Sequence, residues 1–144
     1  MPTLFTIGYE GKTSAEFLDE LSAAGVERLI DVRAVAASRR PGFSKTALSN
    51  ALAERGIEYL HLRPLGTPAE GRQAARAGRT AEMREIYAGQ LETDEAALAM
   101  ERALEAALEK PSALLCYEKA APECHRAMLA ERMVAREGFE VRDL

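Results

Sequence analysis

The sequence predicts a single α/β domain over residues 1–144, with a mostly parallel five-stranded sheet and helices on both faces. Short apolar runs alternate along the chain with segments whose apolar residues recur three and four positions apart. Strands separated by helices in this way pair in parallel through right-handed crossovers. The length of 144 residues suits one ordinary domain, and the chain contains no internal repeat or low-complexity linker.

Five segments are expected as strands, because each is a short apolar run closed by glycine, proline or charged residues. Titratable groups lie at or just beyond the ends of the second, third and fourth segments, namely Asp31 and Arg33, His61, and Cys116 with Glu118. The five segments are Leu4–Ile7, Leu29–Val32, Ile57–Leu62, Ala113–Tyr117 and Phe139–Val141.

Helices are expected between these strands, and most carry start or stop signals. Thr13-Ser-Ala-Glu16 has the form of a capping box, and Ser44 can cap the next helix. In the long third connection, Ala69–Gly78 is expected as an open, arginine-bearing loop or a short helix. Thr80 is expected to cap the helix after it, and Thr93 or Asp94 the next. Pro122 suits the first turn of the last helix, because its missing N–H is not needed there.

Composition and charge exclude several classes of protein. The formal net charge is −4, from 19 basic and 23 acidic residues, which argues against general polyanion binding but allows a local basic cleft. No apolar run approaches the roughly 20 residues of a membrane span. No secretory signal precedes the first strand, so a cytoplasmic location and no membrane partner are expected.

The segment Ala113–Arg126 holds both cysteines of the chain and one of its two histidines. Cys116 ends a buried strand, where a cysteine can simply fill the core. Cys124 falls in the first turn of a helix beside two basic residues, which favours a thiolate. The predicted catalytic residues are Cys116, Glu118, Cys124 and His125, with Glu118 as the general acid or base.

Three uses of the cysteines stay open at this point. The first is a disulfide or resolving pair, and the second is a thiol nucleophile with a histidine as base. The third is a zinc site built from Cys116, Cys124, His125 and His61. The seven-residue gap between the cysteines does not match the usual two-to-four-residue knuckle, so no metal ligand and no cofactor are predicted.

Ligands of parallel sheets bind beyond the carboxyl ends of the strands, so residues at these ends form the expected substrate site. The loop from Arg39 to Ser44 offers two guanidiniums and a turn, which suits phosphate, sulfate or carboxylate. Phe43 and Tyr9 could stack on a ring, and Asp31 is expected mainly as an ion-pair partner of an arginine. The predicted substrate-binding residues are Gly8, Tyr9, Asp31, Arg33, Arg39, Arg40, Ser44, His61 and Arg126.

The layout superficially resembles that of rhodaneses and related phosphatases, in which a Cys-x5-Arg loop cradles an anion. Here Pro122 stands six residues after Cys116, and the first arginine after it is Arg126. Sulfurtransferase or phosphatase chemistry is therefore not transferred.

A second and closer resemblance covers nearly the whole chain. The residues that carry it are Thr6–Tyr9, Asp31–Arg33, Ser38–Ser44, Ile57–Leu62, Cys116-x-Glu118 and Cys124–Arg126. In these residues the chain resembles the domain-of-unknown-function family numbered 488, and it departs from the pattern at Tyr117 and in a variable middle from Arg72 to Thr93. The resemblance implies a compact α/β domain whose cysteine-bearing signature forms part of one site, and it names no reaction.

The leading hypothesis is an enzyme that acts on a small anionic or nucleotide-like substrate at this Cys/Glu/His/Arg site. One alternative is a module that binds a nucleotide or nucleic acid and has structural cysteines. Another is a zinc-stabilised domain. The sequence makes no prediction of the oligomeric state.

Overall fold

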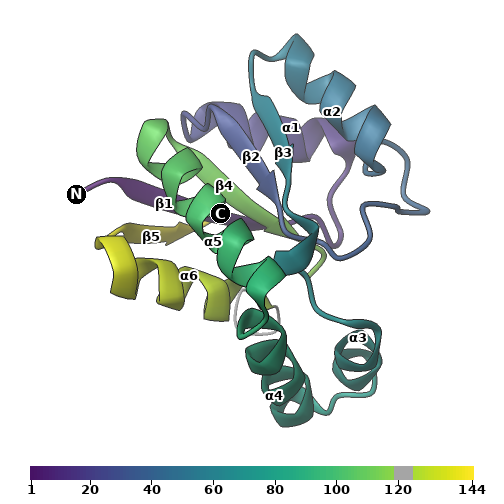
Figure 1. Cartoon of the computed structure of the whole chain (residues 1–144). Coiled ribbons are helices and arrows are strands. Elements are labelled where there is room, and N and C mark those ends of the chain that lie inside the picture. The colour runs from purple at the N-terminus through teal and green to yellow at the C-terminus, as the bar shows by residue number, and fades with distance from the viewer. Residues whose placement is uncertain (119–124) are drawn as a thin grey trace.

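The computed structural model describes residues 1–118 and 125–144. Five parallel strands form one sheet in the order β3-β2-β4-β1-β5, which confirms the predicted α/β fold (Figure 1). The strands are β1 (Thr3–Gly8), β2 (Arg28–Asp31), β3 (Glu58–His61), β4 (Ser112–Cys116) and β5 (Glu140–Asp143).

Six α-helices and one 3-10 helix connect the strands in the described part of the chain. None of the described helices has both the length and the apolar character needed to cross a membrane. The helices are α1 (Ser14–Ala23), α2 (Lys45–Glu54), the 3-10 helix η1 (Arg63–Leu65), α3 (Ala69–Arg76), α4 (Thr80–Leu91), α5 (Asp94–Glu109) and α6 (His125–Glu137).

The sheet separates two apolar cores because successive side chains of a strand point to opposite faces. In β4, Ala113 and Leu115 pack with residues of α1 and α2, whereas Leu114 packs with residues of α4, α5 and α6. The three central strands are buried along almost their whole length, as expected for a parallel sheet covered on both faces.

The residues predicted to cap helices do so at two helix starts and not at two others. The capping box of α1 is present, with Thr13 Oγ1 accepting from the Glu16 N–H at 3.1 Å and Glu16 accepting from the Thr13 N–H at 2.9 Å. Thr93 caps α5 as predicted. Thr80 does not cap α4 but is its first residue. Ser44 occupies the cap position of α2 without a side-chain capping bond, because its hydroxyl binds elsewhere.

At the carboxyl edge of the sheet, the chain leaves the neighbouring strands β1 and β4 toward opposite faces. From β1 the chain passes to α1 on one face, whereas the helix after the neighbouring β4 is α6 on the other face. This divergence opens a crevice between the two strand ends. The helices α3 and α4 stand beyond η1 at the same edge of the sheet (Figure 1).

Candidate functional site

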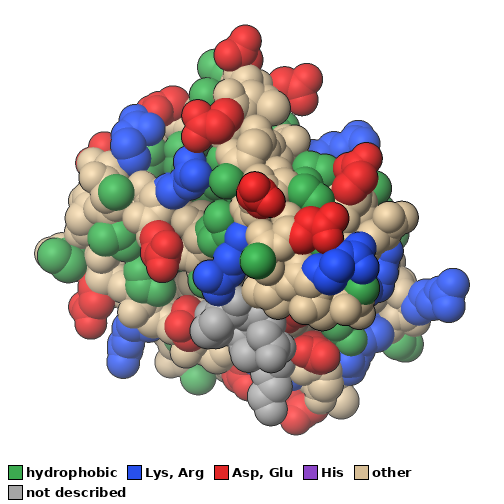
Figure 2. Space-filling model, turned by 90° about the horizontal axis from the view of Figure 1, so that it is seen from below, with side chains coloured by type: hydrophobic (Ala, Val, Ile, Leu, Met, Phe, Trp, Pro, Cys, Tyr) green, Lys and Arg blue, Asp and Glu red, His purple; other side chains and the backbone are tan. Residues whose placement is uncertain are grey.

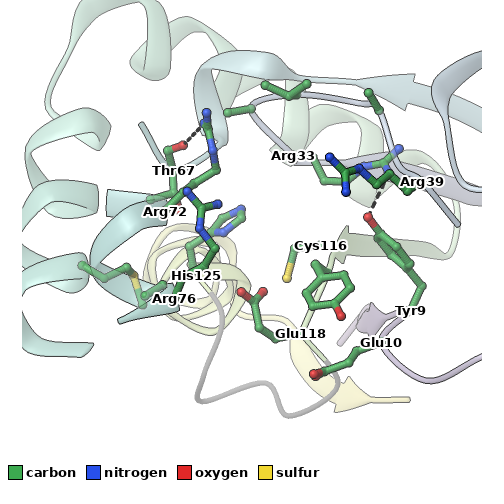
Figure 3. Close-up of a pocket in the computed structure, with 16 residues that line it drawn as sticks. Tyr9, Glu10, Arg33, Arg39, Thr67, Arg72, Arg76, Cys116, Glu118 and His125 are labelled. Carbon is green, nitrogen blue, oxygen red and sulfur yellow. Dashed lines mark hydrogen bonds between the residues drawn. The ribbon is translucent and has the colours of Figure 1, made fainter. Parts of the chain in front are cut away.

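A cavity of about 860 Å³ opens at this carboxyl edge (Figure 3). Its described lining comes from the exits of β1, β2 and β4, from the start of α6, and from α3 and α4. The volume lies within the range of small-molecule sites. The predicted convergence of strand exits at one edge is therefore present, and the long third connection supplies a further wall.

Gly8 allows the ends of β1 and β4 to meet beneath the cavity. A Cβ atom at this position would lie 1.7 Å from the backbone oxygen of Glu118, so no larger residue fits without a shift. The N–H groups of Tyr9 and Glu10 both donate to the Tyr117 carbonyl, at 3.1 and 2.9 Å. The backbone that carries Cys116, Tyr117 and Glu118 is thus tied to the end of β1.

Arg33 lines the cavity, but its guanidinium is already held by the protein. It makes two hydrogen bonds to buried Asp31, from Nε at 2.9 Å and from Nη2 at 2.7 Å, and Nη1 donates to the Phe43 carbonyl at 2.7 Å. Burial alone would lower the pKa of Arg33, and its hydrogen bonds to Asp31 raise that pKa above its ordinary value. The expected ion-pair role of Asp31 is confirmed, and this pair positions the β2 exit.

Tyr59 belongs to the same cluster, although it was not among the predicted site residues. Its hydroxyl donates to Asp31 Oδ2 at 2.5 Å, and burial together with that carboxylate raises the pKa of the phenol. His61, predicted to bind substrate, does not line the cavity; its Nε2 lies 2.8 Å from the Arg33 carbonyl. Both residues therefore support Arg33 from β3.

The loop after β2 sends only one of its two adjacent arginines into the cavity. Arg39 lines the cavity, whereas Arg40 donates to the Lys12 carbonyl and lies over the Phe43 ring at 5.8 Å. Ser44 Oγ accepts from the Ser38 N–H and donates to the Ser38 carbonyl, both at 3.0 Å, which closes the loop. Arg40 and Ser44 shape this loop and do not face the cavity.

The expectation that Phe43 could stack on a ligand ring is wrong. Phe43 is only 1% exposed, and its ring stacks on Tyr9 with the centroids 4.6 Å apart. The exposed aromatic side chain of the cavity lining is instead Tyr117, which is 45% exposed and meets the Tyr9 ring edge to face at 5.3 Å.

Cys116 lies on the cavity floor beside a buried arginine. Its Sγ is 3.1 Å from Nη1 of Arg126, which also donates to the Glu118 carbonyl. Arg126 is completely buried, and this burial lowers its pKa. Arg126 therefore supports the β4 exit from below, whereas it was expected to bind the substrate. Cys116 is disulfide-bonded, and Cys124 lies outside the described residues.

His125 begins α6 and lines the cavity as a buried imidazole. Its Nε2 lies 2.8 Å from the Val32 carbonyl, and its ring packs against Tyr87 with the centroids 4.9 Å apart. Burial lowers the pKa of His125 to about 4, against the smaller opposing effect of the Val32 hydrogen bond. The imidazole is therefore neutral near pH 7, and Nε2 must carry the proton that it donates to Val32.

Sequence reasoning missed the arginines of α3. Arg72 and Arg76 both line the cavity, and Arg72 Nη1 donates to the Thr67 carbonyl at 2.8 Å. Figure 3 shows both on one wall, with Arg39 on the opposite wall. Their spacing of four residues was the available signal, because it places two side chains on one helix face.

The described lining of the cavity carries four arginines (Arg33, Arg39, Arg72 and Arg76) and two glutamates (Glu10 and Glu118). Among the residues that the structure describes, no carboxylate forms an ion pair with Arg39, Arg72 or Arg76. Some arginines elsewhere pair with a carboxylate, as Arg79 does with Glu82. On the face shown in Figure 2, coloured basic and acidic side chains are interspersed, without a continuous basic stripe.

The zinc alternative finds no support in the described part of the chain. Within residues 1–118 and 125–144, no group of three or more His, Cys, Asp or Glu side chains is arranged to hold a metal ion. The Nε2 atoms of His61 and His125 already lie at hydrogen-bond distance from backbone carbonyls.

Comparisons with curated proteins and with solved structures gave no match. A family model does match, over residues 13–133, and this span includes the loop of Arg39, helix α3, and the β4 exit with the start of α6. The family is described as a domain of unknown function, so the match confirms the predicted family and names no reaction. On this match over most of its length, the chain belongs to the DUF488 family.

Proposed function

We propose that this protein is an enzyme that binds a small anionic or nucleotide-like substrate in the cavity. The observation that carries the proposal is the set of three cavity arginines, Arg39, Arg72 and Arg76, that no described carboxylate neutralises. In a chain with an excess of acidic residues, such a set is expected where an anion binds. Guanidinium groups suit this role because they offer several donors in a planar fork.

The groups that can perform chemistry lie between the arginine-bearing walls. Cys116 and Glu118 project from neighbouring positions of the β4 exit, between Arg76 and Arg39 (Figure 3). Glu118 is the proposed general acid or base. In reduced protein, the Arg126 guanidinium 3.1 Å from Sγ would stabilise a Cys116 thiolate, which is the reactive form of cysteine. His125 is proposed as an uncharged hydrogen-bonding group, because its pKa is too low for a proton carrier near pH 7.

Binding is tested by isothermal titration at low ionic strength with sulfate, citrate, AMP and ATP as probes. At least one probe should bind, and a variant in which Arg39, Arg72 and Arg76 are all replaced by Gln should weaken it at least tenfold, as expected for loss of charge-assisted hydrogen bonds. Arg142→Gln is the matched control, since Arg142 is exposed on β5 and does not line the cavity. No binding of any probe, or equal affinities in the two variants, would refute the proposal.

Catalysis is tested on whichever nucleotide binds, with product formation followed by mass spectrometry in the presence of a thiol reductant. Glu118→Gln should retain binding and lose turnover, because it keeps the shape of the side chain and removes its proton transfer. The role of the thiol is tested separately by alkylation with iodoacetamide. If neither cysteine of reduced protein reacts faster than free cysteine, the thiol mechanism is removed and the binding proposal stands.

One observation favours the alternative of a nucleic-acid binding module. Tyr117 is 45% exposed at the cavity, and exposed aromatic rings are the usual stacking platforms for single strands. A single-stranded oligonucleotide would then bind far more tightly than a mononucleotide, with an affinity that falls steeply with salt. Similar affinities for the two, with a shallow salt dependence, would support the small-substrate proposal.

A further inference from the structure

Arg72 and Arg76, which form the α3 wall of the cavity, and the exposed ring of Tyr117 together indicate which chemical class of substrate the cavity binds. We propose that the cavity binds a phosphate monoester of a flat ring, with its phosphate on Arg72 and Arg76 and its ring against Tyr117. This inference rests on the proposed function, because the phosphate and the ring belong to one ligand bound in the same cavity. It adds a phosphate subsite that the Arg39–Ser44 loop does not form.

The two arginines of α3 place like charges on one face of the helix. Residues four apart on a helix are neighbours, and like charges at that spacing destabilise the helix. The positive charge of Arg76 is favourable in the last turn of α3, because it faces the negative end of the helix dipole. That accounts for one cation there. It does not account for Arg72 on the same face, where both side chains line a cavity.

A bound dianion relieves this repulsion and uses both guanidiniums. A phosphate monoester carries up to two charges and three oxygens around a tetrahedral centre, so it can accept from both side chains at once. A single carboxylate has one charge and is satisfied by one guanidinium fork. Arg72 is positioned in advance, because its Nη1 donates to the Thr67 carbonyl at 2.8 Å and its other N–H groups can face a ligand.

Tyr117 offers an aromatic surface at the β4 exit. Its backbone carbonyl accepts from the Tyr9 and Glu10 N–H groups, and its ring meets the Tyr9 ring at an interplanar angle of 83°. These contacts hold the residue in place while 45% of its surface stays exposed. An exposed and anchored ring stacks well on a flat ligand. Glu118, the next residue along the chain, also lines the cavity, and Figure 3 shows it beside Cys116.

The test is isothermal titration of the full chain with AMP, phenyl phosphate, adenosine, inorganic phosphate and succinate. AMP and phenyl phosphate should bind more tightly than phosphate or adenosine. Arg76→Gln should weaken AMP and phosphate about tenfold and leave adenosine unchanged. Tyr117→Leu should weaken AMP about fivefold and leave phosphate unchanged. The matched control is Arg102→Gln, an exposed helical arginine that does not line the cavity.

The possible failures separate the two proposals. AMP that binds no more tightly than adenosine, or equal effects of Arg76→Gln and Arg102→Gln, would overturn the phosphate subsite. Succinate that binds while phosphate does not would also overturn it, although the cavity would remain an anion site. No binding of any anion would overturn both proposals. Arg76 and Tyr117 are exposed, and unchanged circular dichroism spectra would verify that their variants fold.

Discussion

The buried imidazole of His125 should make the free energy of unfolding decrease as the pH is lowered. Its pKa is lowered by burial to about 4, whereas an exposed histidine titrates near 6.5. Between these values the unfolded chain binds a proton that the folded chain does not, so stability falls as the pH falls. The loss begins near pH 6.5 and is complete below about pH 4. At about 1.4 kcal/mol per pH unit, it amounts to about 3 kcal/mol.

The assay is urea denaturation at a series of pH values from 7 to 4, followed by far-ultraviolet circular dichroism. His125→Gln is the informative variant, because an amide can still donate to the Val32 carbonyl but does not titrate. Both proteins carry His61→Gln, so His125 is the only histidine in the reference protein and the variant has none. Carboxylates protonate in both proteins, and their contribution cancels in the difference.

The His61→Gln protein should lose about 3 kcal/mol more stability than the His61→Gln/His125→Gln protein between pH 7 and pH 4. The variant should start from a lower stability at pH 7, since it lacks the ring that packs against Tyr87. Two pH profiles that run parallel within about 0.5 kcal/mol would refute the reasoning, because the imidazole would then be free to ionise in the folded protein.

Three further substitutions test the support of the cavity, each by thermal and urea denaturation. Gly8→Ala should destabilise the protein by about 3 kcal/mol, because its Cβ would lie 1.7 Å from the Glu118 carbonyl oxygen. Gly89→Ala, inside α4 with open space around it, should instead stabilise by about 1 kcal/mol; a loss there would contradict the steric argument. Asp31→Asn should cost about 3–5 kcal/mol by leaving the Arg33 guanidinium buried without its carboxylate, and a change below about 1 kcal/mol would show the pair to be dispensable.

Most of the fold follows from local patterns in the sequence. Leu114 and its neighbours form a continuous apolar run because β4 is buried on both faces, and such runs are readable without the structure. The capping box at Thr13 and Glu16 is equally local, since both partners lie within one turn. Ser44 has the same chemistry as a cap, but a competing bond to the Ser38 backbone, set by the loop, prevents it from capping α2.

The site depends more on contacts between distant segments, which local patterns do not reveal. The burial of Phe43 results from stacking on Tyr9, which is far away in the sequence. Arg126 lies in the first turn of α6, and its direction beneath the β4 exit is set by packing. To predict that α3 lines the cavity, one must know that the β3-to-β4 connection folds back over the carboxyl edge of the sheet. Helical spacing alone identifies which face Arg72 and Arg76 share, and not what that face meets.

The wall formed by α3 belongs to a segment that adds no strand to the sheet. Every β pairing is made by residues before η1 or after α5, so the α3–α4 hairpin contributes no hydrogen bond to the sheet. In the proposed enzyme, a change on the cavity side of α3 would alter ligand preference while Glu118 and the strand exits keep their places. The proposed substrate-selecting wall and the proposed reacting groups would then lie on separate parts of the scaffold.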